Sequence, residues 1–324
     1  MINAKRTVKA ILLGLLASLT IGAATAQAML DPTLLSAYFG LDNALPFAAN
    51  RLCRGAANLD GMPIIFSMVI DETTLDKADF AVTTASGVVS TPVCVTLNPA
   101  IDLGELRTVL ITGEFGNAES DAPVRVEIVG DIFASADSAV NFLGASVEVT
   151  PLAAGPFLVI AETIPLAQWQ LDRASGSQQG DGCPSVDTAQ VVRVTWAGGI
   201  SNSAGDEAGA VERDLYRVTL QLPDGTQSEV TPFALSDLGD GDNNHLLCLD
   251  QRGEPLSVFF PAGYLLDPAR DTLNPDTTVA VQSAPGSIPS TYRNVRYCEV
   301  IPTYRSGITL RTEIWNTLGL NDCP

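Results

Sequence analysis

The chain has 324 residues with 37 acidic and 18 basic side chains, which gives a formal net charge of −19 at pH 7. Because so acidic a surface repels phosphate backbones and anionic lipid headgroups, the composition argues against a protein that binds nucleic acid or membrane surfaces. Three of the basic residues lie in the first 28 positions, so without that segment the balance is 18 − 3 = 15 basic against 37 acidic residues, or −22. Such acidity favours solubility in salty surroundings and also favours cation binding, and both interpretations stay open.

The first 28 residues have the three parts of a secretory signal. Three of the residues between 5 and 9 are basic, residues 11–21 are apolar, and Ala26-Gln27-Ala28 fits an A-x-A cleavage site. A transmembrane anchor is the alternative, but the apolar run is shorter than the roughly 20 residues that span a bilayer. We therefore expect a signal peptide at 1–28, and a mature protein that is periplasmic or secreted and has no membrane span.

Short apolar runs separated by Gly, Pro, Asp and Asn predict a first set of strands within residues 29–171. The runs are rich in Val, Ile, Thr and Phe, and several alternate between apolar and polar residues. We expect strands at 62–70, 80–84, 107–115, 123–132 and 157–164, with a helix at 31–41 before them. These strands should form an N-terminal Ig-like β-sandwich domain, and the polar, Gly- and Ser-rich residues 172–188 should form a linker.

One stretch of this first set, GMPIIFSMVIDETTLDKADFAVTTASGVVSTP at residues 61–92, has a distinctive pattern. A Phe-Ser strand leads into an acidic I-D-x-x-T-L turn and then into an F-x-V-T strand, and the residues of the pattern are Phe66, Ser67, Ile70, Asp71, Thr74, Leu75, Phe80, Val82 and Thr83. It resembles the start of bacterial Ig-like domains of the surface-layer type. The resemblance implies a β-sandwich with a spacer or adhesion role and names no catalytic residue. The remainder is similar only to uncharacterised secreted bacterial proteins.

A second set of apolar runs predicts a C-terminal β domain at residues 189–324. The run 189–198 alternates, and residues 213–235 predict a hairpin in which Tyr216, Val218, Leu220 and Leu222 share one face. Pro223-Asp224-Gly225 should form its turn, because Asp-Gly accommodates positive φ. Further strands are expected at 256–260, 277–282 and 308–315, with a turn or two of helix near 165–171. The sequence thus predicts an all-β protein of two β-sandwich domains stapled by disulfides.

The six cysteines are even in number, and export to an oxidising compartment favours disulfide formation. Six cysteines allow many pairings, and local pairing predicts Cys53–Cys94, Cys183–Cys248 and Cys298–Cys323. No C-x-x-C spacing occurs, which argues against a thioredoxin-like redox site or a zinc ribbon.

Catalytic motifs are scarce. His245 is the only histidine, so a zinc site with two or three histidines is excluded within one chain, and any Ser-His-Asp triad would need this residue. The sequence has no G-x-S-x-G elbow, no Walker loop and no G-x-G-x-x-G after a strand. A secreted hydrolase using paired carboxylates is the alternative function, because 37 acids offer many pairs. No particular pair stands out, and we name no catalytic residue.

The stretch DLGDGDNNHLLCLD, residues 237–250, is the strongest candidate for a metal site. Its Asp240-Gly241-Asp242-Asn243-Asn244 matches the D-x-D-x-N start of calcium loops, although His245 and Gln251 stand where an EF-hand has Gly and Glu. A second oxygen-rich loop at 265–277 lies in the same expected domain. The residues expected to bind Ca²⁺ are Asp240, Asp242, Asn244, Asp267 and Asp271. A solvated acidic turn is the alternative, because Asp, Asn and Gly are the usual turn residues.

These observations together predict an exported, non-enzymatic binding or structural module. Its partner lies outside the cytoplasm and is not identified by the sequence, and nucleic acid is not expected to bind. Ca²⁺ is the one candidate cofactor.

Overall fold

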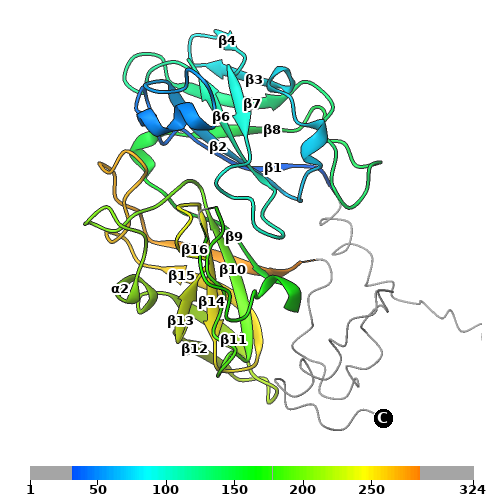
Figure 1. The fold of residues 1–324 in the computed structure, drawn as a ribbon, viewed down its shortest axis with the longest axis vertical. Coiled ribbons are helices and arrows are strands. Elements are labelled where there is room, and N and C mark those ends of the chain that lie inside the picture. The colour runs from blue at the N-terminus through cyan, green and yellow to red at the C-terminus, as the bar shows by residue number, and fades with distance from the viewer. Residues whose placement is uncertain (1–30, 177, 285–324) are drawn as a thin grey trace, which may run out of the picture. The chain divides into compact units, whose positions relative to one another are not determined.

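A computed structural model of the chain describes residues 31–176 and 178–284 (Figure 1). Nearly all of the regular structure within these residues is β-strand, which confirms the predicted class. The expected signal peptide at 1–28, the strand at 308–315 and the Cys298–Cys323 pair lie outside the described residues.

The first sheet has eight strands in the order β4-β3-β7-β8-β1-β2-β6-β5. Its strands are β1 (Leu34–Tyr38), β2 (Asp60–Phe66), β3 (Phe80–Thr84), β4 (Val89–Ser90), β5 (Cys94–Thr96), β6 (Thr108–Gly113), β7 (Pro123–Ile128) and β8 (Ser146–Thr150). Two antiparallel halves meet where β1 pairs in parallel with β8, with Ala37 opposite Val149. The all-β prediction is confirmed but the exact Ig-like sandwich is not, because this pair joins the two halves into one continuous, curled sheet.

The second sheet repeats this arrangement strand for strand. Its strands are β9 (Leu158–Thr163), β10 (Gln190–Trp196), β11 (Arg217–Gln221), β12 (Gln227–Val230), β13 (Ala234–Ser236), β14 (Asn244–Leu249), β15 (Glu254–Phe260) and β16 (Thr277–Ser283). Their order, β12-β11-β15-β16-β9-β10-β14-β13, is the first order with every number raised by eight. The first and last strands, β9 and β16, again pair in parallel. The described chain is therefore two copies of one β topology.

Short helical turns connect some of the strands. They are η1 (Phe47–Arg51), η2 (Glu72–Thr74), η3 (Lys77–Asp79), η4 (Leu152–Ala154), η5 (Leu166–Gln168) and α2 (Ala210–Arg213). The turn η5 confirms the helical turn expected near 165–171. Among the residues that the structure describes, no helix has the length and apolar character that a membrane crossing requires.

Three expectations from the sequence differ from the structure. The helix expected at 31–41 is strand β1, because its backbone pairs with β2 on one side and β8 on the other. Tertiary pairing here overrides a local pattern that fitted a helix. The run 157–164, expected to close the first set of strands, is β9 and opens the second sheet. Residues 172–188, expected as an interdomain linker, lie between β9 and β10 of that sheet.

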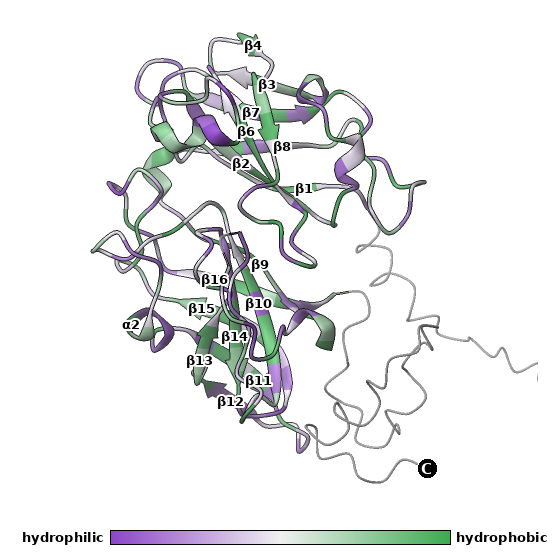
Figure 2. Ribbon diagram, in the orientation of Figure 1, coloured by the Kyte–Doolittle hydropathy of each residue, from purple (hydrophilic) through white to green (hydrophobic). Residues whose placement is uncertain are grey.

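Each sheet curls around its own apolar core, and strand β10 is apolar along most of its length (Figure 2). In the first core the ring of Phe66 packs edge-on against Phe142, with ring centroids 4.9 Å apart. In the second core, Tyr216, Val218 and Leu220 of the predicted hairpin are fully buried on one face, and the hairpin is confirmed.

The two disulfides lie near the same edge of the two sheets, on neighbouring strands of the shared topology. Cys53, in the connection before β2, is bonded to Cys94 of the edge strand β5. Cys183, in the connection before β10, is bonded to Cys248 of β14, which pairs with the edge strand β13. Both predicted pairs are confirmed. On the chain-entropy model each link stabilises the fold by roughly 4 kcal/mol, because it restricts the unfolded chain.

Candidate functional site

Two topologically equivalent loops carry the densest group of buried acids. One loop, residues 97–107, connects β5 to β6, and the other, residues 237–243, connects β13 to β14. Both contain the same short motif, Asp-Leu-Gly followed by an acid, at residues 102–105 and 237–240. We call them the acid loops. The motif glycines, Gly104 and Gly239, both have left-handed backbone conformations, with φ of 93° and 100°. The motif glycine therefore has the same conformation in both loops, whereas the first motif residue has a positive φ of 68° at Asp237 and not at Asp102.

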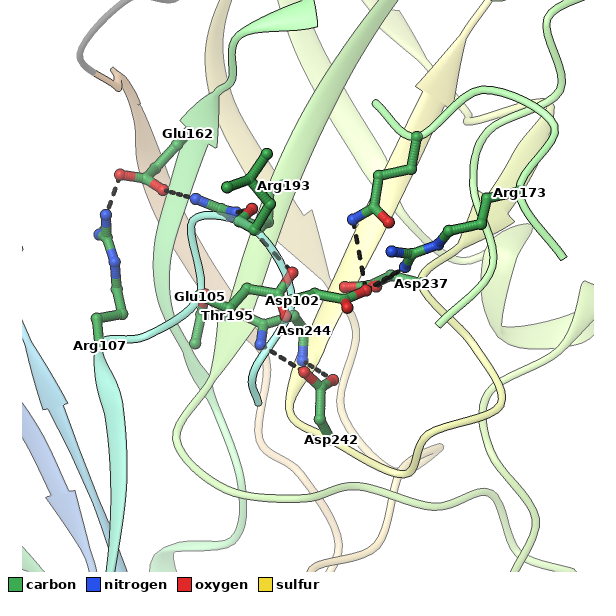
Figure 3. A network of polar contacts seen from close by, with 12 residues as sticks. Asp102, Glu105, Arg107, Glu162, Arg173, Arg193, Thr195, Asp237, Asp242 and Asn244 are labelled. Atoms are coloured by element: carbon green, nitrogen blue, oxygen red, sulfur yellow. Dashed lines mark hydrogen bonds and ion pairs between the residues drawn. The ribbon is translucent and has the colours of Figure 1, made fainter. Parts of the chain in front are cut away.

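The carboxylates of the two acid loops converge on Asp237. Asp237 lies in a group with Asp102 and Asp240 and in a second group with Glu105 and Asp242, and within each group one oxygen per residue lies within 4.8 Å of the others. Asp102, Glu105 and Asp237 are at most 2% exposed, and Asp242 is 8% exposed. Figure 3 shows side chains from both loops turned toward one another. The acids thus form one buried cluster rather than two separate surface turns.

Two arginines contact this cluster. Arg173 hydrogen-bonds Asp102 and lies 4.0 Å from Asp237. Arg193 of β10 lies 3.9 Å from Glu105 and donates to the carboxylate of Glu162, a residue of β9, over 3.0 Å. These contacts are drawn as dashed lines in Figure 3. They tie the acid loops to the framework of the second sheet.

Glu162 is the centre of a buried ion-pair joint between the two sheets. Arg107, at the end of the first acid loop, donates to Glu162 over 3.0 Å, opposite the contact from Arg193. Burial raises the pKa of Glu162, but the two guanidinium groups outweigh it and hold the pKa below its usual value. This carboxylate is therefore ionised and fully paired, unlike those of the acid cluster.

Several oxygens of the acid cluster meet no N–H or hydroxyl donor within the described part of the chain. They are Asp102 Oδ1, Glu105 Oε2, Asp240 Oδ2 and both carboxylate oxygens of Asp237. Buried polar atoms are normally paired, because leaving one unpaired costs roughly 1–3 kcal/mol. The facing carboxylates of Glu105 and Asp237 have no N–H or hydroxyl donor between them. Either a proton or a cation must therefore lie there.

The pKa values of these acids reflect the same crowding. Burial raises the pKa of Asp237 to about 7; a hydrogen bond with Glu105 acts in the opposite direction, and the charges of Asp240 and Asp102 raise the pKa further. Burial, followed by the charges of Asp237 and Asp242, also raises the pKa of Glu105 well above its usual value. The ionised forms of these acids are thus disfavoured unless positive charge is added.

The second acid loop is held in place by groups outside the cluster. The Glu207 carboxylate accepts hydrogen bonds from the backbone N–H groups of Gly239 and Gly241, over 2.5 and 2.6 Å. Asp181 accepts from the N–H of Leu238 over 3.0 Å. These bonds fix the loop backbone, so the positions of its acids are set before any ligand binds.

The structure brings together only part of the calcium site expected from the sequence. Asp240 and Asp242 belong to the acid cluster, and Asn244 donates to Asp242 from both its backbone and its side chain, so it positions that carboxylate. Asp267 and Asp271 belong to neither acid group found among the described residues. One oxygen of Asp267 accepts two backbone N–H groups of its own loop.

His245 differs from an exposed catalytic histidine. The side chain is buried at the start of β14, and its Nδ1 lies 2.9 Å from the hydroxyl of Tyr216. That hydroxyl also accepts a hydrogen bond from the indole N–H of Trp196 over 2.9 Å. Burial lowers the pKa of His245 to about 4. The imidazole is therefore a neutral, hydrogen-bonded member of the second core.

Sequence reasoning did not select Asp102, Glu105 or Asp237 as site residues. Asp102 and Asp237 are far apart in the sequence, and no single window places them together. The repeated Asp-Leu-Gly-acid motif was the available signal, since it marks equivalent loops once the two halves are aligned.

Comparison with known proteins adds a limited structural likeness. No family model matches the chain, and no curated protein matches it. Among solved structures, it is similar to the N-terminal part of the bacterial S-layer protein SbsC, with 13% identity over 80% of this chain and a TM-score of 0.26. It is also similar to domains 1–6 of surface layer protein SbsC, with 10% identity over 81% of this chain and a TM-score of 0.27.

The chain spans about half the length of these two structures, with 46% and 55% of them covered. Both structures are of a surface-layer protein, the type that residues 61–92 resemble in sequence.

Proposed function

We propose that this chain is an exported, non-enzymatic structural module made of two copies of an Ig-like β unit. The observation that carries the proposal is the repeat, since both sheets have one strand order, one parallel closing pair and a disulfide on the edge strand or its neighbour at the same side. The half β1-β2-β6-β5 follows the A-B-E-D order of immunoglobulin domains, and β8-β7-β3 follows G-F-C with β4 added. Repeating one β unit lengthens the protein and enlarges its surface, and neither change requires a catalytic site.

The placement of the chemically versatile side chains supports this proposal. His245 is buried and hydrogen-bonded to Tyr216, so its imidazole is not positioned to act on a solute. The indole N–H of Trp196 also bonds Tyr216, and that of Trp169 bonds the backbone oxygen of Ile164. These groups stabilise the fold. The two disulfides support export, because such links persist in oxidising compartments.

A structural module should unfold as one unit, and the Arg107–Glu162 joint offers a test. We expect scanning calorimetry of the oxidised protein to give one cooperative transition. In Arg107→Ala, the joint between the sheets loses a buried ion pair, a change that typically costs roughly 3–5 kcal/mol. We expect that variant to unfold in two steps.

Arg125→Ala is the matched control for that experiment. Arg125 and Glu127 form an exposed pair, with side chains 51% and 43% exposed, so its loss should leave a single transition. Two transitions in the unmodified protein, or identical behaviour of both variants, would contradict the proposal that the sheets act as one module.

A hydrolase using paired carboxylates is the second candidate, and the raised pKa values of Glu105 and Asp237 are the observation in its favour. Against it, the grouped oxygens lie within 4.8 Å of one another and are buried. Glycosidase carboxyls stand about 5–9.5 Å apart on either side of a sugar. A substrate panel of glycosides, esters, peptides and phosphoesters distinguishes the two. Turnover that disappears in Glu105→Gln would replace the structural proposal.

A further inference from the structure

We propose that the two acid loops together form a calcium site, with Asp237 as the ligand common to both of its carboxylate groups. Asp102 and Glu105 contribute from the first loop, and Asp240 and Asp242 contribute from the second. The site would therefore join the two repeated units. It rests on contacts within the chain and does not depend on the protein's being non-enzymatic.

The unpaired oxygens are the first reason. Asp237 is 2% exposed, yet its oxygens meet no N–H or hydroxyl donor within the described chain, and a proton shared with Glu105 is the one hydrogen bond open to them there. Glu105, at 1% exposure, directs an unpaired oxygen into the same group. A cation between these groups would satisfy the unpaired oxygens at once, because carboxylate oxygens are the preferred ligands of Ca²⁺.

The formal charge of the surroundings is the second reason. Six carboxylates lie in the connected network, Asp102, Glu105, Glu162, Asp237, Asp240 and Asp242, and three arginines accompany them, Arg107, Arg173 and Arg193. Fully ionised, these groups sum to −6 + 3 = −3. Uncompensated charge inside a protein is unfavourable. One divalent cation would reduce the excess to −1.

The ligand chemistry selects a hard cation. Both groups offer only carboxylate oxygens, without histidine or cysteine, and this composition disfavours zinc and copper. Ca²⁺ accepts six to eight oxygens in flexible geometry, whereas Mg²⁺ requires near-octahedral geometry. Asp242 also lines a cleft of about 140 Å³ beside Thr108 and Gly241. Through that cleft water could reach the cation and complete its coordination.

The proposal differs from the sequence-based site in a way that a variant can test. The sequence pairs Asp240 and Asp242 with Asp267 and Asp271, whereas the structure pairs them with Asp102, Glu105 and Asp237. Asp271→Asn should therefore leave calcium binding unchanged, and Asp237→Asn should abolish it.

The experiment is isothermal titration of CaCl₂ into the chelator-treated, oxidised protein, with a thermal melt on the same samples. We expect saturable binding with Kd below about 1 mM, the range of extracellular calcium modules. We also expect the melting temperature to rise by several degrees with calcium, because a ligand of the native state stabilises it by mass action. MgCl₂ should give at least a tenfold weaker response.

Asp237→Asn and Glu105→Gln should each lose calcium binding while melting, without calcium, at or above the temperature of the unmodified protein, since each removes a crowded charge. Asp224→Asn is the charge-matched control. Asp224 lies exposed in the β11–β12 turn, where an asparagine oxygen could still accept from Thr226. This control should bind calcium normally.

Three results would overturn the proposal. They are no binding at 10-fold above the expected Kd limit, unchanged binding in Asp237→Asn, and loss of binding in Asp271→Asn. The absence of binding would mean that a shared proton, and no cation, lies between the carboxylates of Glu105 and Asp237. None of them would affect the calorimetric and turnover tests of the structural module, so the two proposals fail separately.

Discussion

In the first sheet the central aromatic cluster consists of phenylalanines, with Phe66 packed against Phe80 and Phe142, whereas the second sheet contains a polar chain from Trp196 through Tyr216 to His245. Phe80 and Tyr216 occupy matching places in an F-x-V-T and a Y-x-V-T sequence at the start of β3 and β11. The comparison shows that one strand order accommodates either an apolar core or a core with a satisfied hydrogen-bond chain.

The equivalence of these strands is supported by their partners. Val82 of β3 lies opposite Val126, and Val218 of β11 lies opposite Val258, so the same position pairs with valine in both sheets. The hydroxyl of Tyr216 is thus a local addition to a shared framework. Three predictions use this difference between the halves.

The largest expected effect is the pH dependence that His245 of the second sheet contributes. The pKa of His245 is about 4 in the folded chain and about 6.5 when unfolded, so the folded state favours the neutral ring. The contribution of His245 to the free energy of unfolding is present above pH 6.5 and is lost as the pH falls toward 4. The expected loss is about 3 kcal/mol. Urea unfolding at a series of pH values measures it.

His245→Gln is the comparison variant, because its side-chain oxygen could accept from Tyr216 without titrating. The difference in unfolding free energy between the two proteins should shift by about 3 kcal/mol across that range. The crowded acids have raised pKa values and contribute with the opposite sign, but they are present in both proteins. A constant difference would contradict the prediction.

An intermediate effect is expected from exchanging the matched aromatics. Tyr216→Phe removes the acceptor of the Trp196 indole N–H and the partner of His245, and should cost about 2 kcal/mol. Phe80→Tyr should cost a similar amount, because its hydroxyl would enter an apolar core. Denaturant unfolding measures both. If either exchange were neutral, the two cores would be less distinct than their contacts indicate.

The smallest effect is expected at two equivalent turns. Gly87 after β3 and Gly225 after β11 have φ of 87° and 85°, and each donates its N–H to the carbonyl three residues earlier. A Cβ at either glycine would meet no atom within 4 Å. Each Gly→Ala change should therefore cost only the backbone strain, about 1 kcal/mol. Unequal losses in thermal melts would show that the two turns are not equivalent.

Much of the fold could be predicted from local sequence. Apolar alternation located β3, β10 and the β11–β12 hairpin, and nearest-neighbour pairing of cysteines found both described disulfides. Strand β1 was mistaken for a helix, because its buried residues also suit helical spacing and its true partners are distant in sequence. Its strand conformation depends on pairing with β2 and β8, which lie outside the short stretch of sequence around β1.

The site was predicted less completely than the fold. Calcium-loop spacing is local, so the sequence directs attention to Asp240 and Asp242, whereas Asp102 and Glu105 come close to the same cluster only through folding. Asp267 and Asp271 were included because their loop is rich in oxygen, a property that turn-capping residues share. The composition shows that the protein is acidic, but the strand order determines which acidic side chains lie together.

The parallel pairing of β1 with β8, and of β9 with β16, has a consequence for how such a chain can grow. Because the first and last strands run in the same direction, the backbone enters a unit at one pole and leaves it at the opposite pole. The short connection from Thr150 to Leu158 then leads directly into the next unit. Because each unit begins and ends at opposite poles, further units of the same topology could follow one another through similarly short connections.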